Sequence, residues 1–275
     1  MKDGHLAAWI VIVGLTWVIA ASNVAADEQG GKAAHPSIAA QSGKPASGPV
    51  SNDQKGNPVA QGVEPQGEKP TPVYNPPPRG VPARLVPGGT RGPEEKLPML
   101  SVLAPEDIGL TAQEQPSFYW YLSDSITSRI EFTLTDDQTT RPLLEISLTP
   151  PTTPGVQRVR LADYSVRLSP GVPYKWFVAL IPDLDRRSKD IITGGAIERI
   201  ELPAALRAKL TQAGKARTPH IYAEAGLWYD ALTAISELID AAPDDLGLRK
   251  QRASLLDQVR LPEVAESDMR HSSAK

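Results

Sequence analysis

The stretch GVPYKWFVALI, residues 171–181, constrains the fold of this chain more than any other segment. Large apolar residues alternate there with Lys175, Phe177 and Ala179, and this period of two is typical of a β-strand, whose successive side chains point to opposite faces. Since both faces are largely apolar, we expect a central strand that is covered on both sides. The stretch PSFYWYL, residues 116–122, has the same character. We predict that the two stretches are the inner strands of a β-sandwich.

Further short strands are predicted on either side of these two, most with apolar residues at every second position. They occupy residues 99–104, 129–134, 144–148, 157–161 and 191–201. About seven short strands with turns at regular spacing are typical of an immunoglobulin-like or fibronectin-III-like antiparallel β-sandwich. The loop before Tyr174 resembles the one before strand F of fibronectin type III domains, where a tyrosine bonds the upstream backbone. We therefore expect Tyr174 to make such a bond.

The apolar period changes from two to that of a helix after residue 202. Residues 220–245 keep the offsets of the tetratricopeptide repeat, and Gly226 is placed to let two helices turn closely. Helices are also predicted after Pro203 and at about residues 245–259. Such arrays need about three repeats and one is visible, so we predict a small tetratricopeptide-like helical cap that packs on the sandwich or on a partner.

Residues 1–26 have the pattern of a secretory signal peptide. Lys2 precedes an apolar run over residues 6–21, and Val-Ala-Ala at 24–26 supplies the small residues of a cleavage site. The run is shorter than the about 20 residues of a spanning helix, so we expect cleavage, with an uncleaved inner-membrane anchor as the alternative. Both place the rest of the chain outside the cytoplasm.

Residues 27–98 hold about half of the chain's 27 prolines and 21 glycines and few large apolar residues. Such a composition buries too little surface to offset the entropy of ordering, so a disordered linker is predicted. Its last part, residues 75–92, spaces Arg79, Arg84 and Arg91 among prolines and glycines. This part is either more linker or a basic arm that docks on the sandwich or on a partner such as an anionic envelope polymer.

Together these patterns divide the chain into five parts and predict a fold that is mainly β with a C-terminal α part. The parts are a signal peptide at 1–26, a disordered linker at 27–98, a β-sandwich at 99–202, a helical cap at 203–260 and a disordered tail at 261–275.

Composition excludes several classes of function. The net charge of −3 offers no field that attracts nucleic acid, so no nucleic-acid partner is expected. The absence of cysteine excludes disulfides, thiolate chemistry and most structural zinc sites. Of four histidines, only His220 falls near predicted folded structure, which argues against a histidine base or metal ligand. No nucleophile, phosphate-loop or dinucleotide motif is present, and we predict no cofactor and no metal.

The loop PDLDRRSKD, residues 182–190, is one candidate site. Its three aspartates are candidates for loose calcium binding, although the order of an EF-hand loop is missing. The alternative is a solvated hairpin with Asp–Arg pairs. Arg186 and Arg187 are candidates for contact with an anionic group of a partner, by analogy with loops at this end of other sandwiches. The three aspartates are Asp183, Asp185 and Asp190.

The second candidate site lies in the helical cap. Tyr222, Trp228 and Tyr229 are either core residues or, where exposed, a surface that binds a partner protein, because Trp and Tyr dominate interface energetics. Glu224 and Asp230 flank a predicted turn and are either an acid/base pair or charges on a helix surface.

Several segments resemble a known bacterial family. They are LAPEDIGLTAQEQPSFYWYL, PYKWFVAL, AIERIE, IYAEAGLWYDALTAISEL with the following Pro243-Asp244-Asp245, and the earlier PGGTRG. The pattern is similar to the domain-of-unknown-function family 928 (DUF928) over about residues 75–264, and YAEAGLWYDAL is its most specific part. The resemblance implies an exported protein of unassigned activity, of a kind frequent in cyanobacteria. It brings no catalytic residues.

Together with the resemblance, these patterns favour an exported, non-catalytic interaction module in the periplasm or cell envelope of a bacterium, whose helical cap docks another envelope protein. Membrane contact is expected only through an uncleaved N-terminal segment. Two alternatives stay open. One is a carbohydrate- or ligand-binding sandwich in which Tyr119 and Tyr121 stack on sugar rings. The other is a hydrolase that uses the carboxylates of Asp183, Asp185 or Glu224.

Overall fold

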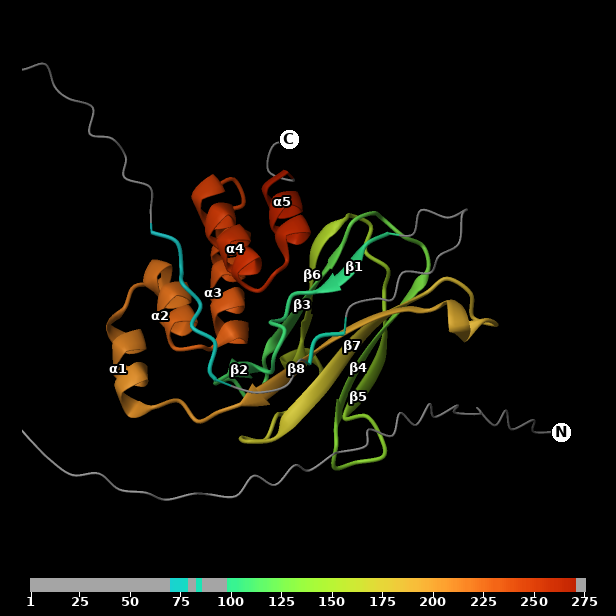
Figure 1. Ribbon diagram of the computed structural model, residues 1–275, viewed down its shortest axis with the longest axis horizontal. Coiled ribbons are helices and arrows are strands. Elements are labelled where there is room, and N and C mark those ends of the chain that lie inside the picture. The colour runs from blue at the N-terminus through green and yellow to red at the C-terminus, as the bar shows by residue number, and fades with distance from the viewer. Residues whose placement is uncertain (1–69, 79–82, 86–97, 271–275) are drawn as a thin grey trace, which may run out of the picture. The chain divides into compact units, whose positions relative to one another are not determined.

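The computed structural model describes residues 70–78, 83–85 and 98–270 (Figure 1). The predicted signal peptide and most of the predicted linker lie outside the described residues. The strands are β1 (Leu100–Val102), β2 (Gly109–Thr111), β3 (Ser117–Leu122), β4 (Arg129–Asp136), β5 (Leu144–Leu148), β6 (Gly155–Arg160), β7 (Pro173–Ile181) and β8 (Ile191–Arg199). The helices are α1 (Ala204–Gln212), α2 (Thr218–Glu224), α3 (Trp228–Ala241), α4 (Leu246–Gln258) and α5 (Pro262–Arg270), with 3₁₀ turns η1 (Leu161–Tyr164), η2 (Arg187–Lys189) and η3 (Lys215–Arg217). The described chain is thus mainly β with a helical C-terminal part, as predicted. None of the helices in these ranges is long and apolar enough to cross a membrane.

The strands form two sheets. The smaller has the order β1-β3-β6 and the larger the order β2-β8-β7-β4-β5. The pairs are antiparallel except β2 with β8, which is parallel and aligns Leu110 with Glu198. The expectation of a wholly antiparallel arrangement is therefore wrong at this edge. A three-residue strand inside a segment that reads as a loop carries too little pattern to be predicted.

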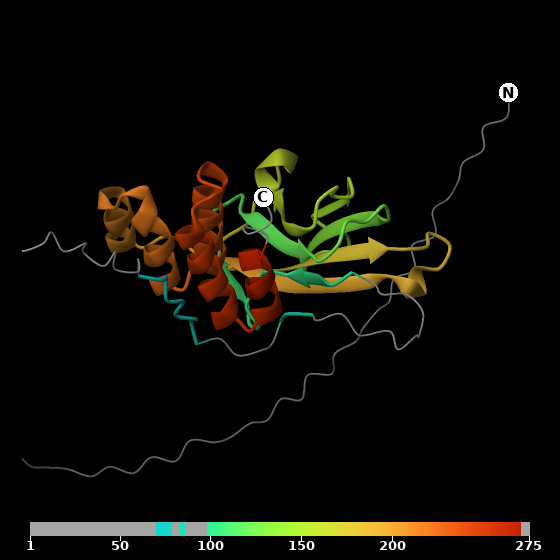
Figure 2. The same cartoon turned by 90° about the horizontal axis from the view of Figure 1, so that it is seen from above.

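The two sheets face each other across an aromatic core. The Phe118 ring of β3 lies 5.3 Å from that of Phe132 on β4 and 4.9 Å from that of Trp176 on β7. All six residues of β3 are buried, because helices cover the outer face of the small sheet. There the Tyr121 hydroxyl and the Ser267 hydroxyl of α5 lie 2.6 Å apart. Both views place the helices at one end of the sheets (Figure 1, Figure 2).

Strand β7 is central in the large sheet, as predicted, but only one of its faces is fully buried. Its inward side chains are buried, whereas Lys175 is exposed and Phe177 and Ala179 are half-buried. The outer face is therefore not covered as expected among the described residues. At the start of the strand, the Tyr174 hydroxyl accepts a 3.0 Å hydrogen bond from the Ser169 amide. This is the bond to the upstream backbone that the loop sequence predicted.

Gly195 of β8 makes room for Trp176. A Cβ atom at Gly195 would lie 3.2 Å from the Trp176 Nε1 and 2.7 Å from the Ala104 Cβ. The indole therefore packs closely against the backbone of the neighbouring strand, where a side chain would push the ring away.

Helix α5 occupies a segment predicted to be a disordered tail, so that prediction is wrong for the residues Pro262–Arg270. The helix is held by a buried ion pair, in which the Arg252 Nη2 of α4 donates to the Asp268 Oδ1 at 2.5 Å. Arg252 also donates to the Ser236 hydroxyl of α3 at 3.2 Å. Both charged residues are about 5% exposed or less. The partners are distant in sequence, so a local pattern cannot reveal them.

Candidate functional site

Trp228 and Tyr229, predicted as docking residues, are core residues in the structure, 0% and 1% exposed. The Trp228 indole donates to the Leu103 carbonyl at 2.9 Å, and the Tyr229 hydroxyl donates to the Ala196 carbonyl at 2.9 Å. The expectation of an exposed aromatic docking surface is therefore wrong for both. The reason is that the first turn of α3 packs against the sheets, which helical spacing alone does not show.

Tyr222 is half-buried on α2 and packs against the edge of the core. Burial raises the pKa of its hydroxyl, and the nearby charge of Asp230 acts in the same direction. Tyr222 is thus partly exposed, whereas Trp228 and Tyr229 are buried, so the three residues do not form one surface.

Glu224 and Asp230 do not form an acid/base pair. Glu224 is exposed and forms an ion pair with Lys209 at 2.7 Å. This pair lowers the pKa of the Glu224 carboxyl. Asp230 is buried, not on a helix surface, and its carboxylate accepts from the Ala112 amide at 3.0 Å and from the Gln113 side chain at 3.2 Å. These hydrogen bonds lower the pKa of the Asp230 carboxyl, but burial has the larger effect and raises that pKa to about 6. Asp230 fastens the segment after β2 to the start of α3.

The Arg186 and Arg187 loop lies between β7 and β8, at the end of the sheets away from the helices (Figure 1). Arg186 forms an ion pair with Asp183, and Arg187 pairs with Asp190 at 2.6 Å and with Glu131 at 2.8 Å. These contacts match the alternative of a hairpin with Asp–Arg pairs. Within the described residues no group of three or more His, Asp or Glu side chains is arranged to hold a metal.

The residues predicted for the two alternative functions, sugar binding and carboxylate-dependent hydrolysis, make structural contacts. Tyr119 and Tyr121 are 2% and 3% exposed, so neither ring offers a face to a sugar in this conformation. Arg186 lowers the pKa of the Asp183 carboxyl, the opposite of what a general acid needs. Asp183 also accepts from the Asp185 amide at 3.0 Å.

Part of the predicted basic arm docks on the folded chain, while Arg79 and Arg91 lie outside the described residues. The Arg84 guanidinium donates to the Ala104 carbonyl at 3.1 Å and to the Val259 carbonyl at 2.7 Å. Leu85 then pairs with Gly194 at the edge of β8. Arg84 is therefore a structural link between the sheet and the end of α4, not an exposed cation for an anionic polymer.

An earlier piece of the predicted linker is also docked. Residues 70–78, here called the strap, run in extended form along the helices. Pro72 and Tyr74 are buried, whereas the alternate residues Thr71, Val73 and Asn75 are exposed. This alternation is that of an extended chain lying on a surface. We call the surface the strap groove; it consists of His220, Ala223, Gly226, Trp228 and Gln258.

Gln258, the last residue of α4, brackets the strap backbone with its side-chain amide. Its Oε1 accepts from the Tyr74 amide at 2.8 Å, and its Nε2 donates to the Pro72 carbonyl at 3.0 Å. The same Nε2 donates to the Ser254 carbonyl at 2.9 Å, which fixes the orientation of the amide. The bracket reads the backbone of an extended segment and not its side chains.

The end of α2 supplies the second backbone clamp. The Asn75 amide donates to the Ala223 carbonyl at 3.1 Å, and the Asn75 side chain donates to the Glu224 carbonyl at 3.1 Å. These carbonyls belong to the last turn of a helix, where no intrahelical donor is available. At the start of the strap, the His220 Nε2 donates to the Pro70 carbonyl at 2.7 Å. The strap thus adds hydrogen bonds to two carbonyls at the end of α2, of which the Ala223 carbonyl also accepts from the Gly226 amide at 3.0 Å.

Tyr74 anchors the strap in the core. Its ring meets the Trp228 ring edge-to-face with centroids 5.0 Å apart, a favourable aromatic geometry. Burial raises the pKa of the Tyr74 hydroxyl, and the charge of Asp107 adds to the shift. The neutral phenol is therefore the form that occupies the groove.

Gly226 gives the strap its closest approach to the helices. Its φ of +76° permits the turn between α2 and α3, as the sequence predicted. A Cβ atom at this position would lie only 2.7 Å from the Asn75 carbonyl oxygen. The same glycine therefore serves both the turn and the strap.

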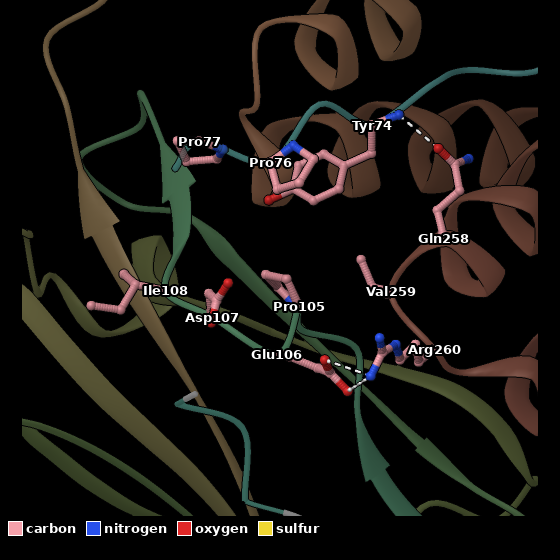
Figure 3. Close-up of a pocket in the computed structure, with 10 residues that line it drawn as sticks. All are labelled: Tyr74, Pro76, Pro77, Pro105, Glu106, Asp107, Ile108, Gln258, Val259 and Arg260. Carbon is pink, nitrogen blue, oxygen red and sulfur yellow. Dashed lines mark hydrogen bonds and ion pairs between the residues drawn. The ribbon is translucent and has the colours of Figure 1, made fainter. Parts of the chain in front are cut away.

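A cleft of about 120 Å³ opens beside the strap. One wall is formed by the strap, one by the segment after β1 and one by the turn after α4 (Figure 3). On its rim Glu106 pairs with Arg260 at 3.3 Å. The ten lining residues are Tyr74, Pro76, Pro77, Pro105, Glu106, Asp107, Ile108, Gln258, Val259 and Arg260. The cleft exists in this form only while the strap is docked.

The sequence model of the Domain of Unknown Function family DUF928 matches residues 86–269, more than half of the chain. The chain belongs to the DUF928 family. This membership confirms the resemblance seen in the sequence. No curated protein matches the chain.

The strap precedes the range matched to DUF928, whereas every residue of the strap groove lies within it. The sequence prediction missed this site because residues 70–78 read as linker. One signal was present: Tyr74 is the single Tyr, Trp or Phe between residues 27 and 98. An isolated aromatic residue among prolines is a candidate anchor, although nothing local says where it binds.

Proposed function

We propose that this DUF928 protein is an exported, non-catalytic interaction module of the bacterial cell envelope, and that its helical cap binds extended segments of protein chain. The observation that carries the proposal is the strap. The helices hold it through a fixed glutamine bracket, carbonyls at the end of α2 and one buried aromatic anchor. This combination of backbone contacts with a single side-chain pocket is how proteins commonly recognise extended peptides.

The proposed docking surface differs from the predicted aromatic cluster: Tyr229 is not part of it, and Trp228 contributes only its ring contact with Tyr74. Those side chains are buried and hold the cap to the sheets. Besides the Trp228 ring, the strap groove presents backbone acceptors and the Gln258 amide to an extended chain. The sheets then serve as the scaffold that keeps the groove residues in place.

We further infer that the two sheets form a fibronectin-III-like sandwich and that α2 and α3 form a tetratricopeptide-like hairpin. The bond between the Tyr174 hydroxyl and the Ser169 amide supports the first. The turn at Gly226 and the fully buried Ala231 support the second, because small residues let the two helices pack closely.

Export is supported by the signal-like sequence of residues 1–26. A fusion of these residues to a reporter enzyme that is active only outside the cytoplasm tests it. We expect reporter activity in cells, and mass spectrometry of the native protein is expected to find an N-terminus at Asp27. An inactive reporter with the protein in the cytoplasmic fraction contradicts export.

The docking role is tested by cross-linking in cells that express tagged wild-type chain or its Gln258→Ala variant. We expect the cross-linked envelope partner to be lost or strongly reduced in the variant, since the bracket is removed. Gln212→Ala, an exposed glutamine at the end of α1, is the matched control and is expected to keep the partner. Identical cross-links for all three proteins exclude the strap groove as the docking surface.

A further inference from the structure

We propose that the strap groove is a binding site for a tyrosine-containing, proline-flanked extended segment of a partner protein, and that the chain's own strap occupies the site until that segment displaces it. This inference rests on the proposed interaction function and specifies the chemistry of the partner. It concerns the surface of His220, Ala223, Gly226, Trp228 and Gln258.

The backbone contacts of the strap can be made by almost any extended chain. Gln258 pairs with a carbonyl and an amide two residues apart, and the Ala223 carbonyl accepts from the amide of the next residue. Such contacts require the extended conformation and not particular side chains. A segment from another protein can therefore reproduce them.

The side chains that the groove does read define the partner. Tyr74 is 7% exposed and meets Trp228, and Pro72 is buried beside it. Val73, which lies between them in sequence, is 62% exposed, so the groove does not select the side chain at this position. The fitting segment therefore carries a proline two residues before a tyrosine. Prolines lower the entropy lost when such a segment is ordered, which favours binding.

The strap has the properties of a displaceable occupant. It contributes one large buried side chain, and it lies outside the range matched to the family, while its groove lies inside that range. As part of the same chain it competes with an effective concentration in the millimolar range, so a free segment binds weakly while the strap is docked. Weakening the strap is expected to raise the apparent affinity for a free segment at least about tenfold.

The test uses the purified full chain and a fluorescent peptide with the sequence of the strap itself, PTPVYNPPP. Tyr74→Ala removes the anchor of the strap and leaves the groove intact. We expect this variant to bind the peptide at least about tenfold more tightly than wild type by fluorescence anisotropy. Adding Gln258→Ala to the variant is expected to abolish the gain, and so is replacing the tyrosine of the peptide by alanine.

A second strap variant guards against misfolding, since Tyr74→Ala removes a buried ring. Asn75→Pro removes the amide that donates to the Ala223 carbonyl and creates no cavity in the core. It is expected to raise peptide affinity in the same direction, with circular dichroism unchanged. If both variants are folded and neither binds the peptide better than wild type, the proposal is overturned.

Two further outcomes are distinguishable. A wild-type dimer that the free peptide disperses would assign the groove to the strap of a second copy, and it overturns the proposal of a different partner. If the wild-type chain forms no envelope cross-link in cells, or the same cross-link as Gln258→Ala, while peptide binding by the purified protein is retained, the proposed cellular role is rejected and the site is not. Peptide binding in purified protein does not depend on export, so failures of the two proposals remain separate.

Discussion

The Trp176 indole donates a 2.8 Å hydrogen bond to the Tyr229 hydroxyl, which donates in turn to the Ala196 carbonyl at 2.9 Å. The bond joins β7, the central strand of the large sheet, to the first turn of α3. Both side chains are fully buried among the rings of the core. The sheets and the helical cap therefore share one core in the described chain, and the groove is built on it.

Tyr229→Phe is expected to destabilise the protein by about 1 to 3 kcal/mol, because it leaves the Trp176 N–H and the Ala196 carbonyl without their buried partner. Urea unfolding followed by tryptophan fluorescence measures the loss. Tyr164→Phe is the matched control, since Tyr164 is 38% exposed, and it is expected to stay within about 0.5 kcal/mol of wild type. Equal effects of the two changes contradict the hydrogen-bonded link.

Trp176→Ala is expected to cost about 3 to 5 kcal/mol, since it removes a fully buried indole and leaves a cavity between the sheets. The melting temperature should fall by several degrees or more in a thermal scan. Lys175→Ala, the exposed neighbour on the same strand, is expected to be nearly neutral. An unchanged melting temperature for Trp176→Ala means that the register of β7 is wrong.

Gly226→Ala is expected to destabilise the protein more than Gly171→Ala. Both glycines have positive φ, but a Cβ at Gly171 meets open space, whereas one at Gly226 strikes the Asn75 carbonyl. Gly171→Ala is expected to cost about 1 to 2 kcal/mol from backbone strain alone. The additional loss of stability in Gly226→Ala measures the contact with the strap. Gly214→Ala has neither problem and should be neutral or slightly stabilising. Equal losses at Gly226 and Gly171 place the strap away from the turn.

Asp230→Asn is expected to change how stability depends on pH. The carboxyl has a pKa of about 6 in the folded protein against 3.8 for the exposed group, so the folded state holds its proton more tightly. Stability therefore falls as pH rises from about 4 to about 6 and is level above that, by about 3 kcal/mol at most. Denaturation at a series of pH values compares the two proteins. The difference in unfolding free energy, wild type minus variant, should decline across this window, and parallel curves contradict the raised pKa.

Asp268→Ala is expected to cost about 3 to 5 kcal/mol, because it leaves the Arg252 guanidinium buried without its counter-charge. Glu266→Ala on the same helix removes an exposed pair with Arg270 and is expected to cost about 0.5 kcal/mol or less. Chemical denaturation of both variants measures the contrast. A null result for Asp268→Ala would restore the prediction of a disordered C-terminal tail.

The strands β3 and β7 and the turn at Gly226 were predicted from sequence because their signals are local. Alternation over several residues identifies a strand, and a helical period broken by glycine identifies a turn between helices. The bond from the Tyr174 hydroxyl to the Ser169 amide joins residues five apart, so it too was within reach of a short motif. Family membership follows from the same local segments.

The site was not predicted, because its parts are distant in sequence. Tyr74 and Gln258 are separated by 184 positions, and neither has a local pattern that names the other. The helical spacing around Trp228 is the same whether the side chain faces a partner or the protein's own core. What buries it is the packing of α3 against β2 and β3, together with the hydrogen bond of the indole to the Leu103 carbonyl just after β1.

By itself the sequence therefore determined the strands other than β2, the helices other than α5, the family, and the expectation of export, each from patterns that a few neighbouring residues carry. Only the tertiary structure decided that Trp228 and Tyr229 are core, that Asp268 is paired, and that a tyrosine in a proline-rich segment lies in a groove of the cap. The physical reason is that burial and hydrogen-bond partners are set by long-range packing. The residue types and spacing within one segment therefore do not show which distant segments it packs against.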